Sequence, residues 1–245
     1  MTASTANSAR PGLSIVVPLY DEAGGVADLV ARVGDFVAAE SPRRELEVIL
    51  VDDGSRDGTW DALGAAIPAG DPRWRRLRHD QNRGLTAALR TGTDAARLPF
   101  VAWLDADLSY EPAILAPLVA ALDEGADLAT ASCHMRGGRI AGVPWIRGWL
   151  SRQASRLYRL ATGRRVATFT CMVRAQRREL LLATWPERQG FLGVTEQLLR
   201  ALGRGAVVVE VPATLHARRS GRSKLRVARA IRAHLGLIAA ARRGL

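Results

Sequence analysis

Short apolar runs, each ended by polar or acidic residues, alternate with amphipathic stretches through the first half of the chain. The runs span residues 13–20, 46–51 and 100–104, a weaker strand is expected at 75–78, and helical patterns span 26–39, 59–66 and 85–96. Runs that are apolar on both faces are typical of strands buried on both sides. Because helices separate the strands, the order predicts an α/β fold with a doubly wound, mostly parallel sheet.

The second half continues the same pattern. Further helices are expected at residues 112–124, 142–161, 195–202 and 225–241, and further strands at 127–132 and 206–211. No repeat or low-complexity linker divides these elements. We therefore expect a disordered lead-in over residues 1–12, one α/β domain over 13–225 and a basic amphipathic helix over 226–245.

Charge is divided unevenly along the chain. Residues 1–125 carry 12 basic and 19 acidic side chains, a net charge of −7, whereas residues 126–245 carry 23 and 5, a net charge of +18. A basic half of this kind indicates an anionic partner, which can be nucleic acid, a membrane surface or phosphate groups.

Several classes of protein are excluded by simple counts. Two cysteines are too few for a disulfide scaffold and fit a reduced, cytoplasmic setting. No apolar run approaches the roughly 18 residues that a membrane-spanning helix needs. The first dozen residues lack the apolar segment of a secretory signal, so we expect none.

Acidic residues follow three of the expected strands, at the sheet edge where doubly wound folds bind ligands. Asp105 and Asp107 are two residues apart after an apolar strand, so both carboxylates can point at one cation. Two carboxylates and diphosphate oxygens suit Mg²⁺ or Mn²⁺. The plainer alternative is a pair of solvated turn residues before the helix at Pro112. Phosphate loops of the GxxxxGK[ST] and GxGxxG types are absent.

Four motifs in the first half resemble those of family 2 glycosyltransferases in order and spacing. They are PLYDE at 18–22, VDDGSRDGT at 51–59, NRGLTAALRTGTDAA at 82–96 and LDADLSYEP at 104–112. The second half resembles the dolichol-phosphate mannose synthase branch through RGWLS at 147–151, TFTCMVRAQRREL at 168–180, TEQLLRA at 195–201, VEVP at 209–212 and RRSGRSKL at 218–225. The resemblance covers residues 12–225 and implies a single Rossmann-like domain of the glycosyltransferase A type.

The same resemblance implies transfer of a sugar, with inversion, from a GDP- or UDP-linked donor to a polyprenyl phosphate. It places the donor nucleotide against Pro18, Tyr20, Glu22, Val51, Asp52, Asp53, Asp105 and Ala106. Asp105 and Asp107 would hold Mg²⁺ or Mn²⁺. The implied catalytic residues are Asp107, Arg218 and Lys224, of which the last two would bind phosphates. Arg147 and Ser151 match positions associated with the acceptor phosphate.

Three positions depart from the family pattern. Cys133 stands at the arginine of G-[ST]-R-Y, Thr168 stands at the aspartate of D-x-T-x-x-F-R, and Asp21 replaces an asparagine. These changes favour an alternative in which the same fold transfers sugar to a soluble hydroxyl compound, with Glu196 or Asp107 as the base that an attacking alcohol wants. Another alternative is a basic binding protein for nucleic acid, against which stands the absence of any nucleic-acid motif.

Two basic amphipathic stretches, residues 142–161 and 225–241, have two interpretations. They can lie at a membrane interface, with Trp145 and Trp149 at headgroup level, which predicts a peripheral protein at the cytoplasmic membrane face that binds no nucleic acid. They can also be ordinary surface helices. In the last helix, the expected shared face consists of Val227, Ile231, Leu235 and Ile238. The four histidines, which show no metal-ligand spacing and are interpreted as structural, are His79, His134, His216 and His234. The sequence leaves the oligomeric state open.

Overall fold

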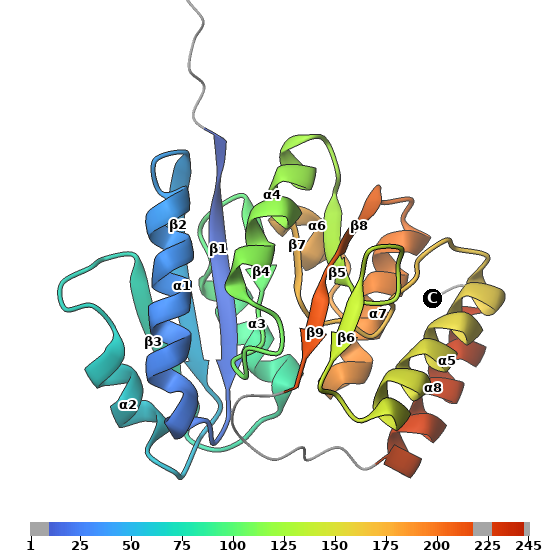
Figure 1. Cartoon of the computed structure of the whole chain (residues 1–245), viewed down its shortest axis with the longest axis horizontal. Helices are drawn as coiled ribbons and strands as arrows, with labels where there is room; N and C mark the ends of the chain where they lie inside the picture. The colour runs from blue at the N-terminus through green and yellow to red at the C-terminus, as the bar shows by residue number, and fades with distance from the viewer. Residues whose placement is uncertain (1–9, 218–226, 243–245) are drawn as a thin grey trace, which may run out of the picture.

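A seven-stranded sheet forms the centre of the computed structural model, which describes residues 10–217 and 227–242 (Figure 1). The strand order is β3-β2-β1-β4-β7-β5-β8. The strands are β1 (Arg10–Leu19), β2 (Arg44–Asp52), β3 (Trp74–Arg78), β4 (Phe100–Trp103), β5 (Leu128–Ser132), β7 (Arg174–Arg177) and β8 (Val208–Pro212). The first four strands pair in parallel, as does β5 with β8, whereas β7 is antiparallel to both its neighbours.

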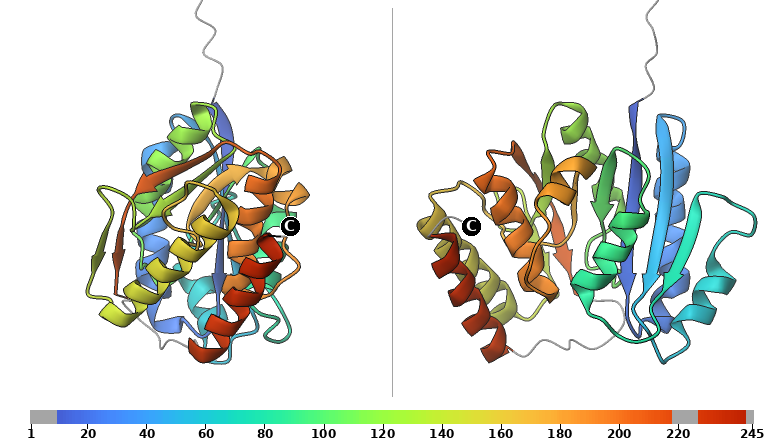
Figure 2. Two further views of the ribbon diagram at one scale, coloured as in Figure 1. Left: turned by 90° about the vertical axis from the view of Figure 1, so that its right-hand side faces the viewer. Right: turned by 180° about the vertical axis from the view of Figure 1, so that it is seen from behind.

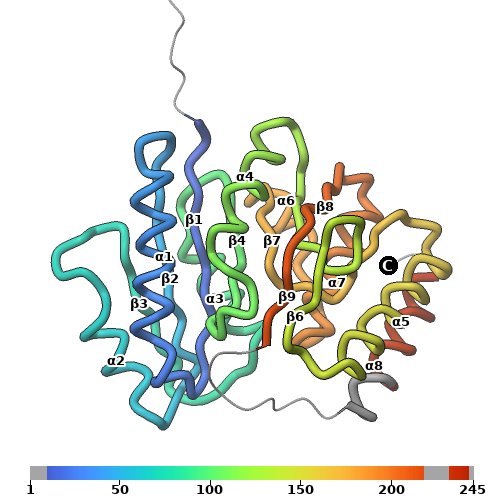
Figure 3. Tube along the Cα trace, viewed as in Figure 1, coloured from blue at the N-terminus to red at the C-terminus, as the bar shows by residue number. Residues whose placement is uncertain are grey.

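Helices cover both faces of this sheet, as a doubly wound fold requires. Seen from opposite sides, α1 and α4 lie on one face and α3 and α7 on the other (Figures 1 and 2). The helices are α1 (Val26–Glu40), α2 (Thr59–Ala66), α3 (Leu85–Ala95), α4 (Leu115–Asp123), α5 (Trp145–Thr162), α6 (Arg178–Ala183), α7 (Gly190–Gly203) and α8 (Val227–Ala241), with short 3₁₀ turns η1 (Ala23–Gly25) and η2 (Pro112–Ile114). Figure 3 shows the chain passing from β1 through α1 back to β2.

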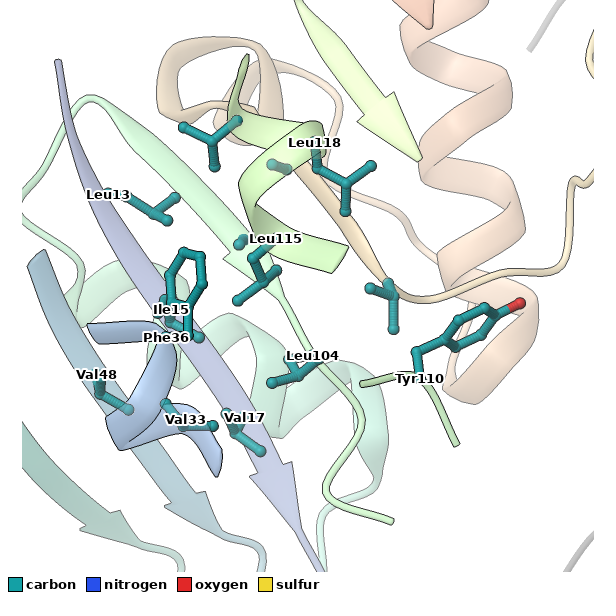
Figure 4. Close-up of a cluster of buried hydrophobic side chains, with 14 of the residues drawn as sticks. Leu13, Ile15, Val17, Val33, Phe36, Val48, Leu104, Tyr110, Leu115 and Leu118 are labelled. Atoms are coloured by element: carbon teal, nitrogen blue, oxygen red, sulfur yellow. The ribbon is translucent and has the colours of Figure 1, made fainter. Parts of the chain in front are cut away.

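The apolar runs are explained by burial on both faces of the sheet. Ile15 and Val17 of β1 pack with Val33 and Phe36 of α1 in one core cluster (Figure 4). Val16, which points to the other face, packs in a second cluster with α3. Alternate residues of the strand therefore enter different cores, so the run is apolar on both faces, with Ser14 as its buried polar exception.

Close packing of α3 on the sheet depends on a glycine. A Cβ atom built on Gly92 would lie 2.3 Å from Cγ1 of Val16. Gly34 of α1 is different, because the nearest atom to its Cβ would be on Trp74 at 4.0 Å. An added methyl group would therefore clash with the sheet at Gly92 but would have room at Gly34.

A buried carboxylate joins β2 to the chain before β4. Glu47 accepts hydrogen bonds from Ser14 Oγ (2.7 Å) and from the Arg97 main-chain N–H (2.6 Å). Arg97 Nε lies 3.1 Å from the other carboxylate oxygen. Burial by itself raises the pKa of Glu47, but the hydrogen bonds from Arg97 and Ser14 outweigh it and the net pKa is lowered.

The expected elements are present, with three corrections. β1 begins at Arg10, so residues 10–12 of the expected lead-in are strand, and residues 1–9 lie outside the described part of the chain. The antiparallel strand β7 was not expected, nor was a small parallel pair formed by β6 (Arg139–Ala141) and β9 (Thr214–His216). In α8 the packed side chains include Leu237 and Ile238, whereas Leu235 is 53% exposed, because this helix packs against α5 and α7.

Helices α5 and α8 lie side by side at the edge of the molecule (Figures 1 and 2). Their amino-terminal ends lie toward the same end of the molecule as the carboxyl ends of the parallel strands (Figure 1). Within residues 10–217 and 227–242, no helix has both the length and the apolar character needed to cross a bilayer.

Candidate active site

The loops after β1 and β2 are bound to each other at the carboxyl edge of the sheet. The main-chain N–H of Asp21 donates to Ser55 Oγ, and that of Glu22 donates to Thr59 Oγ1, both at 2.9 Å. Arg56 N–H returns a bond to Asp21 Oδ1 (3.1 Å). Asp21 has a φ of 54°, in the left-handed region that asparagine and aspartate tolerate better than most side chains. Its replacement of the family asparagine is therefore compatible with this turn.

Asp53 organises the next loop along this edge. Its Oδ1 accepts from Arg83 N–H (2.9 Å) and from His79 Nδ1 (2.7 Å), and its Oδ2 accepts from Gly84 N–H (2.8 Å). His79 also bonds Thr91 Oγ1 through Nε2 (2.8 Å). A carboxylate only accepts, so His79 Nδ1 is the donor in this bond. Asp53 is thus buried in a set of donors at the start of α3.

A small hollow of about 290 Å³ adjoins this loop, lined by Arg78, His79, Asp80, Gln81 and Arg83. Arg78 Nε lies 3.2 Å from Asp52 Oδ2. Of the other expected nucleotide residues, Pro18 and Val51 are register partners on β1 and β2. The Val51 side chain is fully buried in the second core cluster, so only its main chain is available to a ligand.

Asp105 and Asp107 sit in a tight turn directly after β4. Asp107 Oδ1 accepts from Ser109 N–H at 2.9 Å. Leu108, which lies between Asp107 and Ser109, has a φ of 51°. A leucine in the left-handed region is strained, and such strain collects at functional sites. Within the described ranges, Asp21 and Leu108 alone among non-glycine residues have positive φ, and each lies in a loop at this edge.

The donor set at this turn fits a divalent cation shared with a substrate. Asp105 and Asp107 both line one cleft, and both offer hard oxygen ligands. In the part of the chain that is described, no group of three or more His, Cys, Asp or Glu residues could hold a metal. Mg²⁺ is commonly held by one or two carboxylates with substrate phosphates and water completing the shell. The turn therefore fits a cation that arrives with a diphosphate.

A cleft of about 670 Å³ runs from this turn to α5 and α8. Arg147 and Ser151 line it from successive turns of α5, since residues four apart share a helix face. Beyond them the wall is largely apolar, with side chains such as Ile140, Trp149, Leu157, Leu235 and Ile238. The structure thus brings the expected metal residues and the expected acceptor residues to one cavity.

Two of the three departures from the family pattern, Cys133 and Thr168, line this cleft. The side chains of Tyr110 and Thr168 lie near enough to the Cys133 thiol to lower its pKa. Thr168 Oγ1 also bonds Ser132 Oγ (2.7 Å) and accepts from the His134 main-chain N–H (3.3 Å). Burial raises the pKa of the Cys133 thiol, so it stays protonated. The two positions at which the resemblance implies an arginine and an aspartate thus carry a thiol and a hydroxyl.

The histidines and Glu196 differ in their position relative to the cleft. Three of the four histidines, His134, His216 and His234, line the cleft, although nothing in their sequence spacing indicated a shared location. Glu196 is fully buried and accepts from Arg188 and Arg200, and the cleft lining does not include it. It is therefore not placed to act as a base there.

The two expected phosphate-binding cations, Arg218 and Lys224, lie outside the described residues. Ala217, the residue before them, lines the cleft, and His216 N–H donates to Ser109 O at 2.8 Å. Ala217 therefore lies near the turn that holds Asp105 and Asp107.

The sheet order and the acidic loops at its carboxyl edge are those of the glycosyltransferase A-type fold. Among solved structures, glucosyl-3-phosphoglycerate synthase from Mycobacterium tuberculosis, in complex with Mn²⁺, UDP and glucosyl-3-phosphoglycerate, has a TM-score of 0.69 at 20% identity, covering 96% of this chain and 80% of that one. Its complex with Mg²⁺ and UDP has the same TM-score at 22% identity, covering 95% of this chain and 81% of that one.

Sequence comparison gives the family. The family model for glycosyl transferase family 2 matches residues 14–185. Polyprenol monophosphomannose synthase from Mycolicibacterium smegmatis is 33% identical over 218 residues, 86% of this chain and 80% of that protein. Dolichol-phosphate mannosyltransferase from Pyrococcus furiosus is 28% identical over 219 residues, 87% of this chain but only 59% of that protein. The chain belongs to glycosyltransferase family 2.

Proposed function

We propose that this glycosyltransferase transfers a sugar, with inversion, from a GDP- or UDP-linked donor to a polyprenyl phosphate. The supporting observation is the cleft, which joins Asp105 and Asp107 at one end to Arg147, Ser151 and an apolar wall on α5 and α8. A polyprenyl phosphate needs a cation and a hydrogen-bond donor for its phosphate, and an apolar surface beyond them for its chain. The similarity to the mannose synthases from Mycolicibacterium smegmatis and Pyrococcus furiosus points to the same acceptor class.

Transfer to a phosphate does not require a strong general base from the protein. A phosphate monoester has a second pKa of about 6 and is already largely ionised near neutral pH. Arg147 offers a cation beside Ser151, and these two residues would orient the phosphate oxygen toward the donor sugar. Pro18, Tyr20, Glu22, Asp52, Asp53 and Ala106 would surround the nucleotide.

The departing diphosphate needs neutralisation. Asp105 and Asp107 would hold Mg²⁺ or Mn²⁺, and the cation when bound supplies positive charge to the leaving group. Arg218 and Lys224 would bind phosphates from the segment that follows Ala217. Lys224 is the single lysine of the chain, which otherwise uses arginine, and an ammonium is a compact point charge.

The apolar wall continues to the surface, which supports contact with a membrane. On α5, Trp145 is 78% exposed and Leu160 is 83% exposed, and Trp149 and Leu157 are exposed while also lining the cleft. The helix has four arginines and no acidic residue. Aromatic and basic side chains on one exposed helix suit an anionic lipid surface. We therefore propose a peripheral position at the cytoplasmic membrane face.

Product formation tests this proposal. Purified protein is incubated with a panel of nucleotide-sugars and Mg²⁺ or Mn²⁺, with and without polyprenyl phosphate, and the organic-phase product is measured. Asp107→Asn should lower kcat by about 100-fold or more, because it removes a charge from the metal site. Its amide oxygen can still accept from Ser109, so the melting temperature should stay near that of the wild type.

A variant that retains activity within a few-fold would contradict the role of Asp107. Asp35→Asn, which changes an exposed aspartate of α1, is the matched control. Transfer to a soluble alcohol but not to polyprenyl phosphate would favour the alternative acceptor. That alternative has lost one of its two candidate bases, since Glu196 is held by arginines away from the cleft.

A further inference from the structure

His134 links three segments that line the cleft. It follows β5, and its Nε2 lies 3.0 Å from Ser151 Oγ on α5. Ser151 Oγ lies 2.8 Å from Thr170 Oγ1, in the connection between α5 and β7. The His134 main-chain N–H donates to Thr168 of the same connection. All four residues line the cleft, so this network forms part of its wall.

The imidazole of His134 is neutral. Burial, aided by the charge of Arg152, lowers its pKa to about 4. Its Nδ1 is buried and has no hydrogen-bond partner among the described residues. A buried N–H without an acceptor is rarer and costlier than an unused lone pair. The proton therefore belongs on Nε2, which donates to Ser151 Oγ.

This tautomer determines what Ser151 can do. A hydroxyl has one proton to donate and two lone pairs that accept. If His134 donates to Ser151 Oγ, and Thr170 donates to its other lone pair, the Ser151 proton is left to point into the cleft. Ser151 then presents a donor one helical turn from the Arg147 guanidinium.

The network also limits the movement of α5. In this helix of 18 residues only Ser155 and Tyr158 are buried. Ser155 Oγ accepts from Phe169 N–H (3.1 Å), and Tyr158 Oη bonds His234 Nδ1 of α8 (2.9 Å). Neither contact lies in the amino-terminal half of α5, where Arg147 and Ser151 are. The bond from His134 joins that half of α5 to the segment after β5, and the bond to Thr170 joins it to the connection before β7.

We propose that His134 is a positioning residue for the acceptor: it holds Ser151 so that the serine hydroxyl donates to an anionic oxygen of the acceptor beside Arg147. This rests on the proposed function and adds to it a residue that touches the reaction only through Ser151. Binding of the acceptor then depends on the direction of the hydrogen bond between His134 and Ser151. Binding of the nucleotide does not depend on this bond.

Steady-state kinetics with polyprenyl phosphate and the donor found for the wild type tests the proposal. His134→Phe keeps an aromatic ring and removes the donor, and should raise the acceptor KM about tenfold, with kcat and the donor KM changed much less. His134→Gln, whose amide N–H can reach Ser151, should recover most of that loss. Ser151→Ala should match His134→Phe, and the double variant should lose no more than either single one.

Two further measurements distinguish the positioning of Ser151 by His134 from a purely structural role of His134. Nitrogen-15 spectra of histidine-labelled wild-type protein near pH 7 should show His134 as the Nε2–H tautomer. His234→Phe, which removes a cleft imidazole that bonds Tyr158, should leave the full cost of Ser151→Ala in place.

The outcomes are distinct. An Nδ1–H tautomer, or additive losses in the double variant, overturns the inference alone. Equal increases in donor and acceptor KM for His134→Phe do the same. A wild-type protein that does not transfer to polyprenyl phosphate overturns the proposed function, and this inference with it.

Discussion

Asp53 offers a direct test of whether a residue at the nucleotide site acts on the ligand or on the loop. Asp53→Asn preserves size and removes one acceptor. The amide –NH₂ group must face either Gly84 N–H or the pair of donors from Arg83 and His79. The first orientation costs less, because it loses one hydrogen bond and keeps two.

The expected loss follows from these contacts. A hydrogen bond to a charged group contributes about 1.5–3 kcal/mol, and the two retained bonds weaken when their acceptor becomes neutral. Asp53 is 3% exposed, so water compensates little. We expect Asp53→Asn to lower the free energy of unfolding by about 2–3 kcal/mol. For a domain of this size that is a fall of roughly 5–10 °C in melting temperature.

Urea unfolding without nucleotide measures this loss, and calorimetric titration with GDP and UDP measures binding. We expect stability and nucleotide affinity to fall together, because the loop at residues 79–84 loses its anchor. Asp35→Asn should stay within about 0.5 kcal/mol of the wild type. If Asp53→Asn unfolds like the wild type but no longer binds nucleotide, the carboxylate contacts the ligand and this reasoning is refuted.

Three other perturbations have definite expected outcomes. Gly92→Ala should destabilise the protein by about 1–3 kcal/mol through overpacking, whereas Gly34→Ala should be neutral or stabilise it by up to about 1 kcal/mol, and chemical denaturation of both variants measures the difference. The folded-state pKa of Glu47 is lowered, so its contribution to stability is present above its unfolded pKa of about 4.3 and is lost as the pH falls through the folded value. Glu47→Gln should therefore flatten the dependence of melting temperature on pH below about pH 4.5, and an unchanged slope would contradict the assignment. Replacing Trp145 and Trp149 together by Glu should abolish co-sedimentation with anionic vesicles and leave far-UV circular dichroism unchanged, whereas undiminished binding would remove α5 from the proposed membrane contact.

Most of the fold was predictable because local patterns and the sheet agree. Runs such as residues 13–20 are apolar on both faces apart from Ser14, which is typical of a strand buried on both sides, and the strand is found at Arg10–Leu19. The antiparallel β7 was not predictable. Its sequence, Arg174 to Arg177, is polar at three of four positions, yet Arg174 is fully buried with its guanidinium bonded to main-chain oxygens and Gln197.

The candidate site divides in a similar way. The aspartates after β1, β2 and β4 were predictable, since parallel strands place their carboxyl ends at one edge of the sheet. The exposure of Leu235 was not, because the helical pattern of α8 is apolar on more than one side and only its neighbours decide which side packs.

The sequence by itself determined the layered α/β fold, the acidic edge and the membership of glycosyltransferase family 2, because each rests on residues that are adjacent or regularly spaced. Only the tertiary structure decided that His134, Ser151 and Thr170 meet, and that Cys133 and Thr168 line the same cleft. These residues come from the segment after β5, from α5 and from the connection between α5 and β7. Their association depends on how the elements pack around one cleft, and no local pattern in the chain records that packing.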